Sequence, residues 1–67
     1  MTKGVELMIK KRKELGLTQN QLADNVVVIS RNGIALIETG RSKPSVISAE
    51  AIGDYLGFDW TLFFEEE

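Results

Sequence analysis

The stretch TQNQLADNVVVISRNGIALIETG, residues 18–40, decides the fold of this chain. Thr18 and Ser30 within it are good helix N-cap residues, and Gln21 follows Thr18 at the spacing of a capping box. Gly40 is placed to end the second segment as a glycine just beyond a helix C-terminus. The stretch therefore predicts two short helices, one after each cap, joined by a tight turn.

Regular spacing predicts three further helices around this pair. Apolar residues recur at helical spacing over residues 4–15 and again after the cap residue Ser45, and Gly16 and Gly57 supply the stops. A last short helix is expected over residues 60–64. We therefore predict an all-α fold of five helices.

With 67 residues the chain has room for one domain, residues 1–67, and one small core. It contains no Cys and no His, which excludes thiolate sites and removes the usual general base and the commonest metal ligand. The carboxylates are scattered and no Gly-rich phosphate loop is present, so we expect no enzyme, metal, cofactor or small-molecule ligand. There is no run of about 20 apolar residues and no signal-peptide h-region, so we expect a cytoplasmic protein without membrane contact.

The charges are unevenly distributed along the chain. The formal net charge is −2, but all eight Lys and Arg residues lie within residues 1–43, where they face four acids. Residues 44–67 carry six acids and no base. This asymmetry suggests that one end meets a polyanion and the other is kept away from it, although a solvated basic helix and an acidic tail would give the same pattern.

Two short helices joined by a tight turn match the helix-turn-helix, whose second helix enters the major groove of DNA. The spacing alone also fits many small helical bundles. What favours the first alternative is that the chain resembles the Cro/CI-type (XRE-like) helix-turn-helix repressors, from about residue 12 to residue 64. The residues that carry the resemblance are, in chain order, LGLTQ at 15–19, LA at 22–23, SRNGI at 30–34, IETGR at 37–41, KPS at 43–45, LGF at 56–58 and FF at 63–64.

The resemblance implies a five-helix, lambda-repressor-like domain with its helix-turn-helix at about residues 18–39. It also implies a transcriptional regulator, a repressor of phage, mobile-element or operon type, that binds double-stranded DNA at a palindromic operator as a homodimer. The alternative function is a protein-interaction module, such as an antitoxin or antirepressor, that uses the same fold.

The resemblance assigns DNA contacts to the start of each helix of the motif and to the loop after it. Gln19 looks like the glutamine with which the family clamps the DNA backbone, and a solvated first-turn residue is the alternative. Arg41 and Lys43, in the loop, look like phosphate contacts. The expected DNA-binding residues are Thr18, Gln19, Ser30, Arg31, Asn32, Gly33, Arg41 and Lys43.

The first turn of the second helix carries the chemistry of base recognition. Arg31 can donate two hydrogen bonds to guanine, and Asn32 can pair with adenine in the same bidentate way. Ser30 can serve a phosphate or a base, or act only as an N-cap. Gly33 is unfavourable inside a helix by about 1 kcal/mol relative to Ala, so it either lets the backbone approach the groove floor or is a packing glycine. Leu36, where relatives often carry a polar residue, could touch only thymine methyl groups or face the core.

Two further expectations depend on tertiary contacts. Arg12 lies on the apolar stripe of the first helix, and the resemblance places Glu38 opposite it, in an ion pair that ties this helix to the end of the recognition helix. At the acidic end, a domain of this size can rarely bury a dense apolar cluster in full, so we expect a homodimer contact there; a wholly intramolecular aromatic core is the alternative. The cluster consists of Trp60, Leu62, Phe63 and Phe64.

The turn of the motif departs from the family pattern. Three Val and one Ile occupy residues 26–29, a β-branched run that first suggests a short strand. The segment between Ala23 and Ser30 is one residue longer than the family pattern, and Val28 stands where a turn glycine is usual. We therefore predict a helix end followed by a remodelled turn, with two or more of these side chains buried.

Overall fold

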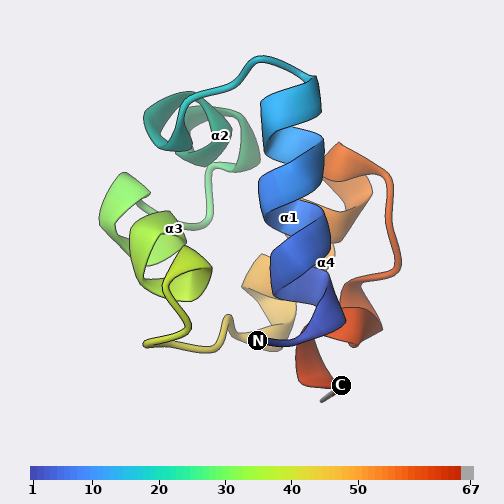
Figure 1. Cartoon of the computed structure of the whole chain (residues 1–67). Coiled ribbons are helices and arrows are strands. Elements are labelled where there is room, and N and C mark those ends of the chain that lie inside the picture. The colour runs from blue at the N-terminus through green and yellow to red at the C-terminus, as the bar shows by residue number, and fades with distance from the viewer. Residues whose placement is uncertain (66–67) are drawn as a thin grey trace.

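The computed structural model describes residues 1–65, which form four α-helices and a 3-10 helix (Figure 1). The elements are, in chain order, α1 (Lys3–Glu14), α2 (Gln19–Val26), α3 (Arg31–Glu38), α4 (Val46–Leu56) and the 3-10 helix η1 (Trp60–Phe64). The all-α prediction is confirmed, and the predicted last helix is a 3-10 helix rather than an α-helix. The helix-turn-helix consists of α2, α3 and the turn between them.

Each of these elements begins at a polar side chain that caps it. The side-chain oxygen accepts a hydrogen bond from a first-turn backbone N–H at 3.0–3.3 Å. At Thr18 the predicted capping box is complete, because Gln21 Oε1 also accepts from the Thr18 backbone N–H at 2.9 Å. The caps are Thr2, Thr18, Ser30, Ser45 and Asp59. Four of these five caps directly precede a helix start that the sequence predicts. The sequence therefore locates those helix starts to within about one residue.

Glycines in the left-handed region end three of the four α-helices. Gly16, Gly40 and Gly57 have φ angles of +70°, +76° and +82°. In each case the backbone N–H of the following residue donates to a carbonyl in the last turn of the helix at 3.0 Å. These glycines stop α1, α3 and α4 where the sequence predicts.

Helix α2 ends differently, at Val27. This residue has φ 76° and ψ −42°, a strained conformation for a β-branched side chain. The sequence placed Val28 at the position of the turn glycine; the structure places Val27 there, because α2 ends at Val26. Of the four residues only Val26 is buried, while Ile29 is half-buried against the core and Val27 and Val28 are exposed, so fewer of these side chains are buried than predicted. The run is therefore a helix end and a turn, as predicted, and not a strand.

The core lies where all five elements meet, because α1, α2, α3, α4 and η1 each contribute buried apolar side chains to it. Figure 1 shows α1 crossing the centre of the molecule, with α2 and α3 on one side and η1 close to the N-terminal end of α1. Gly4 permits that close approach, because a Cβ at this position would lie 2.5 Å from the Phe63 backbone nitrogen. The largest fully buried side chains are Phe63, Met8, Leu22, Ile34, Ile37 and Ile52. Among the described residues, no helix is long and apolar enough to span a membrane.

Candidate nucleic-acid interface

The start of α3 presents polar side chains to solvent. Arg31 and Asn32 are both exposed in its first turn, and neither side chain has a bonded partner within residues 1–65. Ser30 Oγ accepts a hydrogen bond from the Gly33 backbone N–H at 3.2 Å, so the N-cap role is present. The Ser30 hydroxyl hydrogen remains available to a phosphate or a base. The first turn thus holds two unengaged side chains with the geometry and chemistry for reading base edges.

Gly33 has a packing reason for being glycine. A Cβ there would lie 2.6 Å from Ile29 Cγ1 and 3.0 Å from Ile29 Cδ1. Ile29 precedes the N-cap and is half-buried against the core, which also contains Ile34 of the first turn of α3. Ile29 therefore fixes the entry of the chain into α3 in the manner of a hydrophobic staple, and Gly33 makes room for it.

Arg12, Glu38 and Gln19 form one hydrogen-bonded network, which we call the Arg12–Glu38–Gln19 network. Glu38 Oε2 accepts from Arg12 Nε at 2.7 Å, and Glu38 Oε1 accepts from Arg12 Nη2 at 3.1 Å. Glu38 Oε1 also accepts from Gln19 Nε2 at 3.0 Å. Arg12 Nη1 donates to the Leu17 carbonyl at 2.8 Å. The Arg12 and Glu38 side chains are only 11% and 9% exposed, so this pair is largely withdrawn from solvent.

The network connects both helices of the motif to α1. Arg12 lies in α1, Leu17 in the loop before α2, Gln19 is the first residue of α2 and Glu38 is the last residue of α3. A bidentate pair between a guanidinium and a carboxylate has a fixed geometry. The pair therefore fixes α1 against the C-terminus of α3, and the bonds to the Leu17 carbonyl and from Gln19 bring the N-terminus of α2 to the same point.

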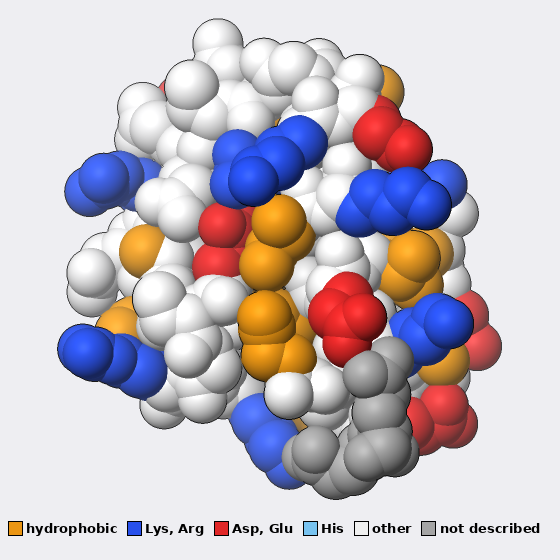
Figure 2. Space-filling view, viewed as in Figure 1, with side chains coloured by type: hydrophobic (Ala, Val, Ile, Leu, Met, Phe, Trp, Pro, Cys, Tyr) orange, Lys and Arg blue, Asp and Glu red, His pale blue; other side chains and the backbone are white. Residues whose placement is uncertain are grey.

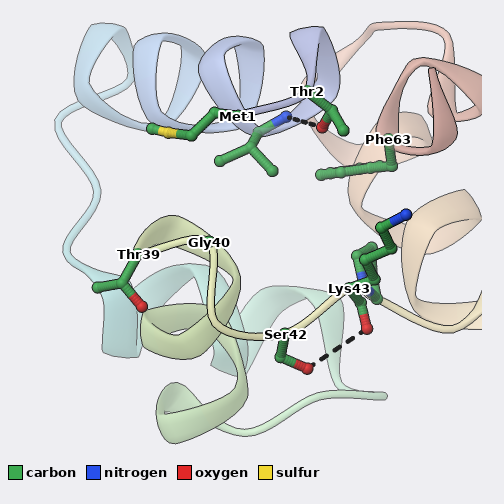
Figure 3. Close-up of a pocket in the computed structure, with 9 residues that line it drawn as sticks. Met1, Thr2, Thr39, Gly40, Ser42, Lys43 and Phe63 are labelled. Atoms are coloured by element: carbon green, nitrogen blue, oxygen red, sulfur yellow. Dashed lines mark hydrogen bonds between the residues drawn. The ribbon is translucent and has the colours of Figure 1, made fainter. Parts of the chain in front are cut away.

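The loop between α3 and α4 carries the remaining predicted contacts. Arg41 and Lys43 are both exposed there. A groove of about 340 Å³ lies between this loop and the N-terminal end of α1, with Phe63 on its far wall. Figure 3 shows the Lys43 side chain turned toward the Phe63 side of the groove, with Ser42 Oγ donating to the Lys43 carbonyl at 3.4 Å.

Other Lys and Arg side chains are distributed over the same molecule. Figure 2 shows them over α1 and on the side of α2 and α3. Lys3, Lys10 and Lys13 of α1 are exposed.

Two further residues singled out in the sequence have different environments. Thr18 is an exposed cap whose Oγ1 accepts from the Gln21 backbone N–H at 3.0 Å, and Leu36 is half-buried in α3.

The structure divides the predicted aromatic interface. Phe63 is fully buried in the core, and its ring packs against Phe58 with centroids 5.5 Å apart. Trp60 and Leu62 are half-buried, and Phe64 is 40% exposed. The Trp60 and Phe64 rings meet edge to face with centroids 6.2 Å apart. Phe64 is thus the most accessible of the four residues, and Phe63 is the least.

Asp59, the cap of η1, accepts two hydrogen bonds from Thr61. Its Oδ1 accepts hydrogen bonds from Thr61 Oγ1 at 2.7 Å and from the Thr61 backbone N–H at 3.0 Å. The side-chain hydrogen bond from Thr61, followed by the backbone one, lowers the pKa of Asp59 below its ordinary value. The ionised Asp59 carboxylate therefore holds the start of η1.

An α2–turn–α3 unit with an exposed, polar first turn on the second helix defines the helix-turn-helix class of DNA-binding proteins. The helix-turn-helix family model HTH_3 matches residues 8–63. The chain is similar to YqaF, an uncharacterized HTH-type transcriptional regulator of Bacillus subtilis (strain 168), with 49% identity over 57 residues, which cover 85% of this chain and 74% of that protein. It is also similar to an uncharacterized HTH-type transcriptional regulator of Methanothermobacter thermautotrophicus, with 49% identity over 51 residues, which cover 76% of this chain and 72% of that protein. The chain belongs to the XRE-like helix-turn-helix family of transcriptional regulators.

Two features of the site are not evident from the sequence. The hydrogen bond between Gln19 and Glu38 joins residues 19 positions apart, and its only sequence signal is that both flank the motif. The contact of Ile29 with Gly33 has a clearer signal, since a bulky residue before an N-cap and a small residue at the third helical position occur together.

Proposed function

We propose that this protein is a sequence-specific DNA-binding repressor, of phage, mobile-element or operon type, that binds a palindromic operator as a homodimer. The observation that carries the proposal is the first turn of α3, where Arg31 and Asn32 are exposed and unengaged within the described residues. Their backbone is held by the Ser30 cap and the Ile29 contact. Arg31 would pair with guanine and Asn32 with adenine in the major groove. A domain that covers an operator in this way blocks transcription without further chemistry.

The distribution of charge supports the same orientation on DNA. Residues 1–43 contain all eight basic residues, and residues 44–67 contain six of the ten acids. The motif, the loop after α3 and α1 would face the phosphates, and the acidic C-terminal end would face away. In this arrangement Gln19 and Arg41 would contact phosphates. Lys43 would contact a phosphate as well, once its side chain has rotated away from the groove.

The homodimer would use the exposed part of the aromatic end. Phe64 is the exposed member of the predicted interface, and Trp60 and Leu62 are half-buried. Phe63 supports that surface from inside the core. A two-fold axis there would place two recognition helices about 34 Å apart, one turn of DNA.

The experiment that tests the proposal is selection of bound sequences from a random duplex pool. We expect an enriched palindrome with half-sites about one DNA turn apart. Arg31→Ala and Asn32→Ala should each weaken binding by about 10- to 100-fold and relax the sequence preference at one base pair per half-site. Failure to enrich any sequence would contradict the proposal.

One surface favours a second candidate, a protein-interaction module of antitoxin or antirepressor type. Helix α4 exposes Ile47 at 70%, Val46 at 51% and Tyr55 at 42%, and the proposed DNA complex assigns no contact to these side chains. This candidate predicts no enriched duplex, no effect of Arg31→Ala, and binding to a protein partner that Ile47→Ser abolishes.

A further inference from the structure

The Glu38 carboxylate determines which end of the Gln19 carboxamide faces it. A carboxylate can only accept hydrogen bonds, and a carboxamide can donate only through Nε2. The atom 3.0 Å from Glu38 Oε1 is therefore the nitrogen of Gln19. Nε2 carries two hydrogens, and one is directed at Glu38. The second hydrogen remains for an acceptor outside the protein.

The orientation of this carboxamide matters because a phosphate is also purely an acceptor. Gln19 is the first residue of α2, beside the N-terminal amides of that helix. A phosphate oxygen there can accept the second hydrogen of Nε2. If the carboxamide rotated by half a turn, Oε1 would face the phosphate and the contact would be repulsive. A Gln19 side chain without Glu38 would sample both orientations.

Arg12 makes Glu38 compatible with a neighbouring phosphate. An uncompensated carboxylate would repel DNA and would be unfavourable at 9% exposure. Arg12 donates to both carboxylate oxygens, at 2.7 and 3.1 Å, and so neutralises the charge and fixes the carboxylate plane. Its third bond, to the Leu17 carbonyl, holds the loop that leads into α2.

From this arrangement we propose that Arg12 and Glu38 are positioning residues for DNA binding, which orient the Gln19 carboxamide so that its nitrogen faces the phosphate. The role is additional to any stabilisation of the fold by the ion pair. It rests on the proposed function, since it describes how one of its phosphate contacts is prepared before DNA arrives.

The test is a cycle of variants measured on the duplex that the unmodified protein selects. The pair variant Arg12→Met/Glu38→Leu replaces the ions by apolar side chains of similar size, an exchange that buried pairs often tolerate. It is compared with Gln19→Ala and with the triple variant. We expect Gln19→Ala and the pair variant each to lower affinity about tenfold, and the triple variant to be no weaker than either. Circular dichroism checks that all variants are folded.

Arg41→Ala is the matched control in this cycle. Arg41 belongs to the loop after α3 and does not contact the network. The fold-decrease in affinity caused by Arg41→Ala should therefore multiply in full with the fold-decrease caused by the pair variant. If the ion pair were only structural, the loss of affinity caused by the pair variant would multiply in full with the loss from Gln19→Ala, just as it does with the loss from Arg41→Ala. Losses that multiply to about a hundredfold in the triple variant would overturn the proposal, as would a pair variant that binds like the unmodified protein.

A second measurement uses the unmodified protein and does not depend on the folding of a variant. NMR relaxation of side-chain carboxamides in the DNA-free protein should show Gln19 to be rigid and Asn20, its exposed neighbour, to be mobile. Equal mobility of the two carboxamides would overturn the proposal. A protein that binds no duplex would instead contradict the proposed function, so the two failures are distinguishable.

Discussion

Two single residues of the motif, Val27 in its turn and Glu38 at its end, carry its strained backbone and its buried carboxylate. Val27 occupies a positive-φ position with its side chain 80% exposed, so it gains little packing in return for the strain. Glu38 accepts three side-chain hydrogen bonds from two residues. A substitution at Val27 should therefore be able to raise the stability of the protein, whereas almost no single substitution should be tolerated at Glu38.

Val27→Gly should stabilise the protein. Glycine adopts φ 76° without steric conflict, and relief of about 1–3 kcal/mol of strain outweighs the roughly 1 kcal/mol of extra entropy that glycine gives the unfolded chain. We expect a melting temperature about 5 °C higher. Val28→Gly is the matched control, because Val28 has a negative φ and glycine there should lower the melting temperature. A decrease with Val27→Gly equal to that of the control would contradict the strain argument.

Glu38→Ala should largely unfold the protein at 37 °C. The change leaves the Arg12 guanidinium, 11% exposed, without its carboxylate, and removing one member of a buried pair costs about 3–5 kcal/mol. A small domain has a total stability of only about 3–10 kcal/mol. Thermal unfolding followed by circular dichroism measures the effect, with Glu14→Ala, an exposed acid of the same chain, as the control. An unchanged melting temperature would show that the pair contributes nothing to folding.

At the scale of elements, the sequence predicts well where helices begin and end. Thr18, Ser30 and Ser45 cap α2, α3 and α4 as expected, because a cap depends only on residues within one turn of it. It predicts less well what depends on contacts between elements. That Phe63 is core while Phe64 is 40% exposed depends on the approach of η1 to α1 at Gly4. The orientation of Gln19 likewise depends on Glu38, a whole helix away.

Gly4→Ala should disrupt the contact between α1 and η1. An added Cβ would lie 2.5 and 2.6 Å from the backbone nitrogen and Cα of Phe63, which cannot move without displacing η1. We expect the free energy of unfolding to fall by about 1–3 kcal/mol, although alanine is favoured over glycine within a helix by roughly 1 kcal/mol. Urea unfolding monitored by Trp60 fluorescence measures it. Gly33→Ala is the control, since its Cβ would meet side-chain atoms of Ile29 and Ser30 and no backbone atom among its nearest neighbours, and equal losses at both sites would contradict the argument.

Acid should weaken the start of the 3-10 helix η1, because an ionised carboxylate caps it. Hydrogen bonds from Thr61 lower the pKa of Asp59 in the folded state, so the ionised carboxylate stabilises the fold above about pH 4. That stabilisation is lost as the pH falls through the lowered pKa of the folded state. Melting temperatures between pH 5 and pH 2 should therefore fall less steeply for Asp59→Asn than for the unmodified protein. Parallel curves would show that Asp59 does not link η1 to pH.

At the scale of the whole molecule, the separation of charge should set how binding responds to salt. In the proposed complex, exposed basic residues of the first 43 positions would neutralise phosphates and release counterions, while the acids beyond them would make no phosphate contact. Base contacts from Arg31 and Asn32 would add sequence preference to that background. Salt dependence and sequence preference should therefore respond to different residues.

Arg41→Ala separates these two contributions. Because Arg41 is exposed in the loop after α3 and would contact phosphate only, its removal should weaken binding to specific and non-specific duplexes alike. The slope of log affinity against log salt concentration should become shallower by about one unit. Asn32→Ala is the contrasting change, since a neutral side chain that reads a base should leave the slope unchanged and reduce only the preference for the specific site. Titrations at several salt concentrations on both duplexes measure both quantities. If Arg41→Ala altered sequence preference and left the slope intact, the loop would be reading bases, and the orientation of the molecule on DNA argued from its charge would be wrong.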